Sequence, residues 1–263
     1  MTYGHLHVLF QRLCQSFLDA VFPRTCLICG AFEGLQPLDK KVATDPLRHI
    51  TALCFCKSCQ KDLRPIDSPF CSKCGRPFIS RQGENHACWE CLVEQRYFRK
   101  ARAFGLYDGA LMEAIHRLKY GRHTSLAQPL SALLRETFFQ CWDVTTVDLL
   151  VPVPLHLRRL RQRGFNQAYL LIRRWAKQDG IAIDGLTLSR SRWTEPQTAL
   201  SRKERKKNIK GAFAVKRPET IRGKQIVLVD DVYTTGSTVN ECARVLMKAG
   251  AALVDVLTLA RAV

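Results

Sequence analysis

The sequence predicts an α/β protein in which a cysteine-rich N-terminal unit precedes a mostly parallel β-sheet flanked by helices. Two observations lead to this fold class. Ten of the twelve cysteines lie before Leu92, and eight of them form four C-x-x-C pairs. After residue 98, stretches with helical apolar spacing alternate with short runs of β-branched residues, a pattern typical of parallel sheets. The 263-residue chain is 46% hydrophobic, enough for one large domain or two smaller ones. We expect domains at 1–98 and 99–263.

The first expected element is a short amphipathic helix at the N-terminus. Its apolar residues recur with helical spacing, namely Leu6, Leu9, Phe10, Leu13, Phe17 and Val21. The segment lacks the basic leading region and the uninterrupted apolar core of a signal peptide. No apolar run in the chain approaches the ~20 residues needed to span a bilayer. We therefore expect a cytoplasmic protein without stable membrane insertion, whose cysteines are kept reduced.

The cysteine pairs predict two structural zinc sites, which together form a double zinc ribbon. Tetrahedral zinc takes four soft ligands, and two C-x-x-C pairs supply all four without leaving a position for water. Pairing in chain order gives a first site of Cys26, Cys29, Cys56 and Cys59 and a second site of Cys71, Cys74, Cys88 and Cys91. Crossed pairing stays open, as does participation of Cys54 or His86. Disulfides are the alternative, and a reducing compartment disfavours them.

Helices and strands alternate along the rest of the chain. Apolar spacing predicts helices over 110–121, 126–139, 166–180 and 237–251. Ser237 is the expected cap of the last helix, and Gly250 is its expected stop. Apolar runs predict buried strands over 147–152, 223–231 and 252–261. In a sheet of this kind, ligands bind beyond the carboxyl ends of the strands.

The stretch QIVLVDDVYTTGSTVNE, residues 225–241, carries the most specific chemical signal. Two adjacent carboxylates, Asp230 and Asp231, end a predicted strand, and small or hydroxylated residues lead from there into a helix. A helix N-terminus offers unpaired N–H groups and partial positive charge, so this loop is expected to bind a phosphate. Like charges repel, so the carboxylates suit a neighbouring group instead, either sugar hydroxyls or magnesium. A sugar phosphate satisfies both halves of the motif.

The segment IVLVDDVYTTGST resembles the signature of the type I phosphoribosyltransferases, which bind phosphoribosyl pyrophosphate (PRPP) with magnesium. The resemblance implies a phosphoribosyltransferase-like fold. It implies that Asp230 and Asp231 are the catalytic pair and contact the ribose 2′ and 3′ hydroxyls. It also implies that Thr234 to Thr238 wrap the 5′-phosphate. The whole implied PRPP-binding loop consists of Val232, Tyr233, Thr234, Thr235, Gly236, Ser237 and Thr238. A P-loop is excluded, because the chain has no G-x-x-x-x-G-K-[ST].

A wider resemblance covers nearly the whole chain. Cysteine ribbons come first and LKYGR, VPVPLHLRRLRQRGFNQ, EPQTALSRKERKKNIKGAF and the PRPP loop follow in order. This order is similar to that of the ComF family of competence-associated, phosphoribosyltransferase-like proteins, which includes bacterial DNA-utilisation proteins. The resemblance implies a role with imported single-stranded DNA, during transformation or when DNA is used as a nutrient. Other DNA-uptake proteins are then expected partners.

The same resemblance implies where the diphosphate of PRPP binds. The VPVPL segment falls at the family's pyrophosphate loop, which here consists of Val151, Pro152, Val153, Pro154 and Leu155. Proline lacks an N–H group, so Val153 and Leu155 are the expected backbone donors. Arg163 is placed to neutralise phosphate charge, with a solvated helix entry as the alternative. Lys119 is a weaker candidate, because a single lysine on a helix is more often simply exposed.

A second basic stretch, SRKERKKNIK, offers a contact for either diphosphate or nucleic acid. Its cations are Arg202, Lys203, Arg205, Lys206, Lys207 and Lys210. In the first interpretation the stretch is a mobile flap that closes over the diphosphate, and in the second it contacts the DNA backbone. The alternative to both is a solvated basic loop.

The charge balance keeps a second class of function open. The chain carries 41 basic and 23 acidic residues, a net charge of +18, and residues 151–224 alone hold 19 Lys and Arg against 5 Asp and Glu. Such a field favours a polyanion. The protein is therefore either an enzyme that transfers phosphoribose to an unidentified acceptor or a non-catalytic protein that binds single-stranded DNA or senses PRPP. In the binding protein, bases would stack on Phe165, Tyr169, Trp175 or Trp193.

Overall fold

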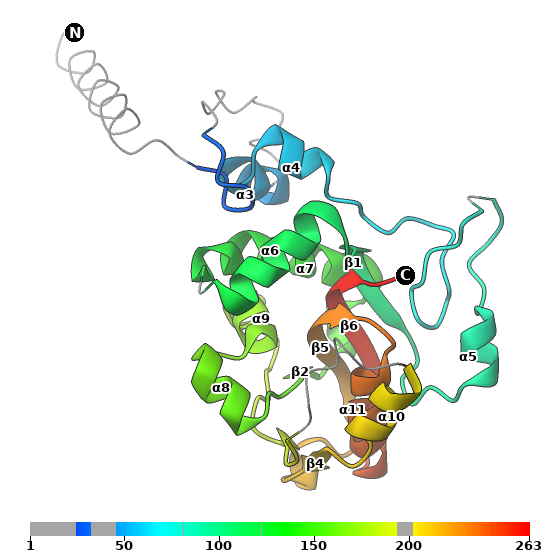
Figure 1. The fold of residues 1–263 in the computed structure, drawn as a ribbon. Helices are drawn as coiled ribbons and strands as arrows, with labels where there is room; N and C mark the ends of the chain where they lie inside the picture. Colours follow the sequence, from blue (N-terminus) through cyan, green and yellow to red (C-terminus); the bar gives the residue numbers. More distant parts are fainter. Residues whose placement is uncertain (1–24, 33–45, 81, 122, 194–201) are drawn as a thin grey trace, which may run out of the picture. The chain divides into compact units, whose positions relative to one another are not determined.

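The computed structural model describes residues 25–32, 46–80, 82–121, 123–193 and 202–263 (Figure 1). Contacts divide the chain into two compact units, Met1–Lys61 and Asp62–Val263. The expected N-terminal helix lies outside the described residues. None of the described helices has the length and apolar composition needed to cross a membrane.

The first unit contains a cysteine turn and two short helices. An isolated antiparallel bridge joins Thr25 and Phe32, and the chain turns between them at Gly30, whose φ is +77°. Glycine adopts this conformation without steric cost, which permits the tight turn. Helices α3 (Pro46–Cys54) and α4 (Lys57–Lys61) follow.

A four-stranded parallel sheet forms the centre of the second unit. Its strands are β1 (Ala101–Leu106), β2 (Leu149–Pro152), β5 (Gln225–Tyr233) and β6 (Leu253–Arg261), in the spatial order β1-β6-β5-β2. Eight of the nine residues of β6 are buried, as expected for a strand covered on both faces. The sequence predicted the last three strands. It did not predict β1, whose residues ARAFGL include no β-branched side chain.

Helices cover both faces of this sheet (Figure 1). Four of them confirm the sequence prediction to within a few residues: α6 (Gly109–Tyr120), α7 (Ala127–Cys141), α9 (Gln167–Gln178) and α11 (Ser237–Lys248). α7 packs on β1 and β6, α9 packs on β5, and α11 packs against β5, β6 and β4, one strand of a small antiparallel pair. That pair consists of β3 (Leu188–Arg190) and β4 (Phe213–Val215).

Shorter elements complete the second unit. They are α5 (Trp89–Val93), α8 (Leu157–Arg163), α10 (Arg202–Ile209) and the 3-10 turns Thr124–Leu126, Val144–Thr146 and Pro218–Thr220. The structure does not describe the side chains of Arg202, Lys203, Arg205 and Lys206 in α10.

The second cysteine group is built into the core of the sheet domain. Ala101 N–H at the start of β1 donates to Lys73 O at 2.7 Å, and Arg102 Nη1 donates to Ser72 O at 3.0 Å. A Cβ atom at Gly75 would lie 2.7 Å from Ala101 O, so only glycine permits this approach. The four sulfur-bearing side chains share one buried cluster with residues of α11 such as Cys242. A domain boundary near residue 98 remains a prediction about independent folding.

Candidate functional site

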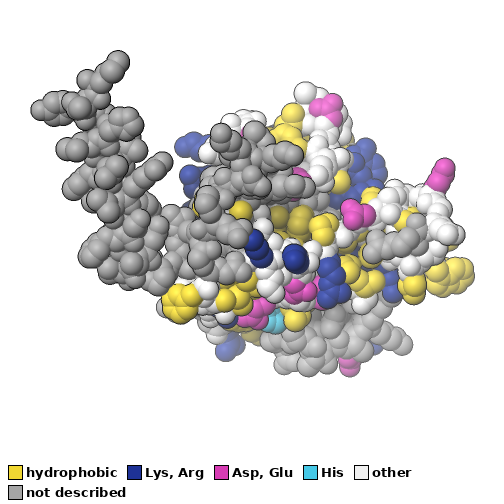
Figure 2. Space-filling model, turned by 90° about the horizontal axis from the view of Figure 1, so that it is seen from above, with side chains coloured by type: hydrophobic (Ala, Val, Ile, Leu, Met, Phe, Trp, Pro, Cys, Tyr) yellow, Lys and Arg dark blue, Asp and Glu magenta, His cyan; other side chains and the backbone are white. Residues whose placement is uncertain are grey.

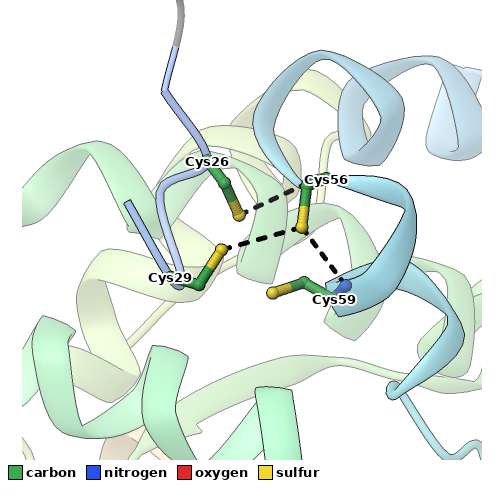
Figure 3. A group of neighbouring side chains, drawn as sticks. All are labelled: Cys26, Cys29, Cys56 and Cys59. Carbon is green, nitrogen blue, oxygen red and sulfur yellow. Dashed lines mark hydrogen bonds between the residues drawn. The ribbon is translucent and has the colours of Figure 1, made fainter. Parts of the chain in front are cut away.

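Each half of the cysteine-rich region gathers four sulfur atoms. The sulfurs of Cys26, Cys29, Cys56 and Cys59 lie within 4.8 Å of one another (Figure 3). Those of Cys71, Cys74, Cys88 and Cys91 do the same. Both groups follow chain order, so the structure does not use the crossed pairing that the sequence had left open.

The two groups match the geometry of tetrahedral zinc. With zinc–sulfur bonds of about 2.3 Å, the edges of a sulfur tetrahedron measure roughly 3.8 Å. The Cys29–Cys56 and Cys74–Cys88 sulfurs lie 3.7 and 3.8 Å apart. Backbone N–H groups also point at the sulfurs: Cys56 N–H donates to Cys26 Sγ at 3.3 Å, and Cys88 N–H donates to Cys71 Sγ at 3.2 Å. Such donors stabilise thiolates, so both groups fit a metal ion.

The two extra ligands considered from the sequence lie outside these groups. His86 stacks on the Phe78 ring at 4.2 Å, and its Nδ1 lies 3.0 Å from Glu84 O. Cys54 is half-buried, and its carbonyl accepts a hydrogen bond from Leu27 N–H at 2.9 Å. Neither side chain belongs to the metal-binding groups found among the described residues.

A pocket of about 620 Å³ opens in the second unit where the strands end. It exists because neighbouring strands stop at different points. The β2 ladder ends with Pro152 opposite Val229, whereas β5 continues to Tyr233 alongside β6. Asp230 and Asp231 therefore lie within the last part of β5 rather than after it, beside the space that β2 has left. Both carboxylates line the pocket.

The two carboxylates have different environments. Asp231 is buried, and its Oδ2 lies 2.6 Å from Nζ of Lys119 on α6. Asp230 Oδ1 accepts the Asp231 N–H at 2.9 Å. Burial and the neighbouring Asp231 charge together raise the pKa of Asp230 to about 8, although the charge of Lys119 opposes them. Asp230 is thus poised to lose a proton when a cation or hydrogen-bond donor arrives.

Lys119 is a central residue of the site, although its sequence context made it only a weak candidate. Its side chain is only 16% exposed. Burial alone would lower the pKa of Lys119, but the attraction of Asp231 outweighs this effect, so the pKa is raised and the lysine stays charged. Its position two residues before Gly121 carries no local signal of this role, because its partner lies far along the chain.

The loop after β5 turns into α11 through a left-handed glycine. Gly236 has φ +76° and occupies the N-cap position, while Ser237 is the first helical residue and not the cap, contrary to the prediction. Ser237 N–H donates to Thr235 Oγ1 at 3.3 Å, and the two hydroxyl oxygens lie 2.9 Å apart. Thr234, Thr235 and Thr238 line the pocket. The loop thus presents hydroxyls and a helix N-terminus to the pocket that holds the carboxylates.

Basic side chains surround these groups. The described cations that line the pocket are Arg76, Lys119, Arg159, Arg163, Arg190 and Arg261, against the carboxylates Glu90, Asp230 and Asp231. Burial lowers the pKa of Arg163, and the opposing charge of Asp231 limits this change. Arg163 Nη1 donates to Gln167 Oε1 at 2.6 Å. The excess of cations favours a ligand with several negative charges.

The VPVPL segment divides at the pocket edge. Val151 and Pro152 are buried in β2, whereas Val153, Pro154 and Leu155 line the pocket. The Val153 N–H donates to Val229 O at 2.8 Å, so it extends the sheet. The Val153 N–H is therefore not available to a ligand, contrary to the prediction.

The second basic stretch is described only in part. Its residues Lys207 and Lys210 are exposed, and neither is among the residues that line the pocket. The side chains of Arg202, Lys203, Arg205 and Lys206 lie outside the described residues. A role for this stretch stays a prediction.

The two tryptophans proposed for base stacking differ in their exposure to solvent. Trp175 is buried, and its Nε1 donates to Leu171 O at 2.9 Å, so its ring is not available for base stacking and that prediction was wrong. Trp193 is half-buried, with the guanidinium carbons of Arg158 and Arg159 at 4.9 and 5.6 Å from its ring centre.

Comparisons with known proteins give the family. The phosphoribosyl transferase domain family matches residues 163–262. "DNA utilization protein YhgH" of Salmonella typhimurium is 36% identical over 210 residues, covering 79% of this chain and 90% of the relative. "Competence protein F" of Haemophilus influenzae is 32% identical over 219 residues, covering 81% and 93%. "Competence protein ComFC" of Bacillus subtilis is 29% identical over 269 residues, covering 98% and 97%. The chain therefore belongs to the ComF family of competence and DNA-utilisation proteins and carries a phosphoribosyltransferase-like domain.

Proposed function

We propose that this protein binds magnesium-PRPP in the pocket at the end of β5 and acts on imported single-stranded DNA or its products. The observation that carries the proposal is the joining of three features in one pocket. These are the Asp230–Asp231 pair, the hydroxyl-rich entry of α11 and a surplus of arginines. A ribose with a phosphate at one end and a diphosphate at the other matches all three. The relative named "DNA utilization protein YhgH" supports the link to DNA.

The carboxylates suit the ribose. Hydroxyl groups donate hydrogen bonds, and ionised carboxylates only accept them. Asp231 is paired with Lys119 at 2.6 Å, and Asp230 becomes an acceptor once it has lost its proton. Carboxylate oxygens are also ligands that magnesium prefers, so these two residues would help to hold the ion, which would neutralise charge on a leaving diphosphate.

The loop and the arginines suit the phosphates. A 5′-phosphate would lie against Thr234, Thr235 and Thr238 at the N-terminus of α11. The diphosphate would then lie toward Arg159 and Arg163. In a transferase reaction, an acceptor nucleophile would form a bond to C1 of the ribose while the bond from C1 to the diphosphate oxygen breaks. The arginines would stabilise the charge on that leaving group.

The two cysteine groups would hold structural zinc. All four positions of each site are filled by sulfur, which leaves none for a substrate or water. Metal binding would contribute to folding of each ribbon, because a site of four thiolates does not persist in an unfolded chain.

A single-stranded DNA-binding function is the second candidate, favoured by Trp193. The ring lies among Arg158, Arg159 and His156, whose imidazole centre is 5.2 Å away. Aromatic rings and arginines together stack bases and contact phosphates. On the face in Figure 2, Lys and Arg side chains are interspersed with Asp and Glu and do not form one patch. The argument for DNA therefore rests on the local cluster around Trp193.

Calorimetry with magnesium-PRPP tests the proposal. The wild type should bind, and a double Asp230→Asn, Asp231→Asn variant should lose binding while remaining folded. Asp143→Asn is a matched control, since Asp143 is exposed and only caps a 3-10 turn. No binding by folded, zinc-loaded wild type would refute the proposal. Binding would justify a screen for acceptors that release pyrophosphate, and a salt series with single-stranded DNA would test the second candidate.

A further inference from the structure

We infer that the second cysteine site and the ligand pocket are coupled, with Arg261 as the positioning residue that connects them. Metal held by Cys71, Cys74, Cys88 and Cys91 orders the start of the phosphate loop. A ligand on that loop in turn holds the metal more firmly. The ligand half of this inference rests on the proposed function.

Arg261 touches both sites with one guanidinium group. Its Nη2 donates to Cys74 Sγ at 3.6 Å. Its Nη1 donates to Thr234 O at 2.7 Å and to Tyr233 O at 3.3 Å. The guanidinium is planar and rigid, so a shift of the sulfur group moves these carbonyl contacts as well. Tyr233 and Thr234 are the two residues through which β5 enters the loop.

Charge explains why Arg261 stays between the two sites. It is buried, with 4% exposure, and a guanidinium remains protonated in proteins. Besides the sulfur, its acceptors are the carbonyl oxygens of Tyr233, Thr234 and Ala262. A zinc ion with four thiolate ligands has a net charge of −2, so the loaded site supplies a counter-charge within contact distance. Loss of the metal removes this compact anion from beside the arginine.

Aromatic packing makes the connection stiff. The Arg261 guanidinium lies 4.1 Å from the centre of the Tyr233 ring, which is itself fully buried. Phe98 meets that ring edge-on at 6.3 Å. On the loop side, a Cβ atom at Gly236 would collide with the Tyr233 hydroxyl. The loop therefore rests directly on the side chain that Arg261 covers, and neither can move alone.

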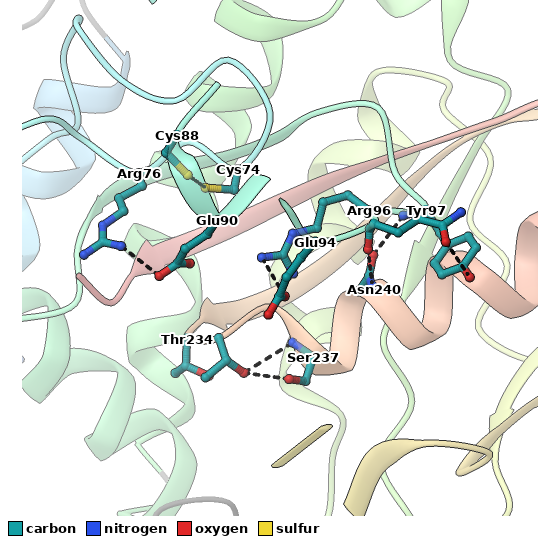
Figure 4. A network of polar contacts seen from close by, with 12 residues as sticks. Cys74, Arg76, Cys88, Glu90, Glu94, Arg96, Tyr97, Thr234, Ser237 and Asn240 are labelled. Atoms are coloured by element: carbon teal, nitrogen blue, oxygen red, sulfur yellow. Dashed lines mark hydrogen bonds and ion pairs between the residues drawn. The ribbon is translucent and has the colours of Figure 1, made fainter. Parts of the chain in front are cut away.

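The cysteine turns also supply part of the pocket wall. Arg76 follows Cys74 by two positions, and Glu90 lies between Cys88 and Cys91. Their side chains form an ion pair at 3.1 Å, drawn near Cys74 and Cys88 in Figure 4, and both line the pocket. The Cys71 N–H donates to Arg76 O at 2.7 Å, so Arg76 belongs to the same hydrogen-bonded turn as two of the sulfurs. Metal that fixes these turns therefore also fixes this wall.

Zinc release provides the test, because coupling between two binding sites is reciprocal. Zinc-loaded full-length protein is mixed with a zinc-selective chelator, and release is followed with and without saturating magnesium-PRPP. We expect the ligand to slow release from one of the two sites by about tenfold in the wild type. Arg261→Gln should keep two zinc ions per chain but lose this protection. Arg261→Lys, which keeps the positive charge but not the planar guanidinium group, should restore only part of the protection.

Arg99→Gln is the matched control. Arg99 also makes a two-pronged contact to β6, through Asp255 at 3.1 and 2.6 Å, and within the part of the chain that the structure describes its guanidinium bonds to that carboxylate and not to the sulfurs or the loop. It should retain ligand-dependent protection. If magnesium-PRPP binds the wild type and leaves zinc release unchanged, or if Arg261→Gln retains full protection, the coupling is refuted while the proposed function stands.

A readout without ligand separates the two proposals. Removal of zinc from the second site should increase amide hydrogen exchange at residues 233–240, and Arg261→Gln should produce a similar increase with zinc in place. If magnesium-PRPP fails to bind the wild type, the proposed function fails, and this exchange experiment alone decides the coupling. Unchanged exchange at 233–240 after loss of the second zinc would overturn it.

Discussion

Replacing Lys119 by methionine should destabilise the second unit by about 3 kcal/mol at pH 7.5. The Nζ–Oδ2 distance to Asp231 is 2.6 Å, and the two side chains are 16% and 6% exposed. At an effective dielectric constant of about 20, that separation corresponds to roughly 6 kcal/mol of attraction. The substitution also removes the cost of desolvating the lysine, which offsets about half of this loss. The result falls in the range of about 3–5 kcal/mol for breaking a buried pair.

The loss should depend on pH in a definite direction. Lys119 lowers the pKa of Asp230, so its removal raises that pKa above about 8 and leaves the buried Asp231 carboxyl group without its partner. Carboxyl groups with a pKa higher in the folded than in the unfolded state bind more protons when folded. Their stabilising effect is present below the unfolded pKa and is lost as pH rises through the folded pKa. The variant should therefore approach wild-type stability as pH falls toward 4 and be weakest above pH 8.

Urea unfolding followed by tryptophan fluorescence measures this loss. All four tryptophans lie within Asp62–Val263, so the signal reports the second unit alone. Arg117→Met is the matched control on the same helix, because the exposed pair with Glu113 should contribute no more than about 0.5 kcal/mol. Asp231→Asn in the Lys119→Met background should recover most of the stability. A loss below about 1 kcal/mol, or one that does not change with pH, would refute the buried-pair argument.

Three further predictions follow from the site and the ribbons. Affinity for magnesium-PRPP should rise about tenfold between pH 7 and 9, because Asp230, with a pKa of about 8, must lose a proton for the ligand to bind. Calorimetry in two buffers with different ionisation enthalpies should show the release of that proton. An affinity that does not change with pH would contradict this prediction. Gly236→Ala should lower the free energy of unfolding by about 1–2 kcal/mol and abolish ligand binding, because φ is +76° and the new methyl group would collide with Tyr233. An unchanged melting temperature would argue against this. Elemental analysis should find two zinc ions per chain. The variants Cys29→Ser and Cys88→Ser should each bind one zinc ion fewer. Full zinc content in either variant would contradict the assigned ligands.

The local sequence pattern was enough to predict an element or a site wherever the contacts that determine it are close in sequence. Helical spacing of apolar residues located α6, α7, α9 and α11, because each helix buries one face of its own residues. Spacing of the C-x-x-C pairs located both sulfur groups, because a tight turn already brings two ligands together. The β5 loop was recognisable because a strand end, two carboxylates and a helix start lie within one short segment. The roles of its residues toward PRPP remain predictions.

Tertiary structure decided what depends on distant partners. β1 has weak strand character of its own and exists because β6 supplies its ladder. Trp175 looks available for stacking in the sequence but is buried where α9 meets α7. Lys119 and Arg261 resemble ordinary surface cations until the fold brings one against Asp231 and the other against Cys74. Burying a charge requires a partner, and only the folded chain determines which residue that partner is. The sequence alone therefore determined the elements and the motifs of this protein, while the fold determined which charges form its pocket.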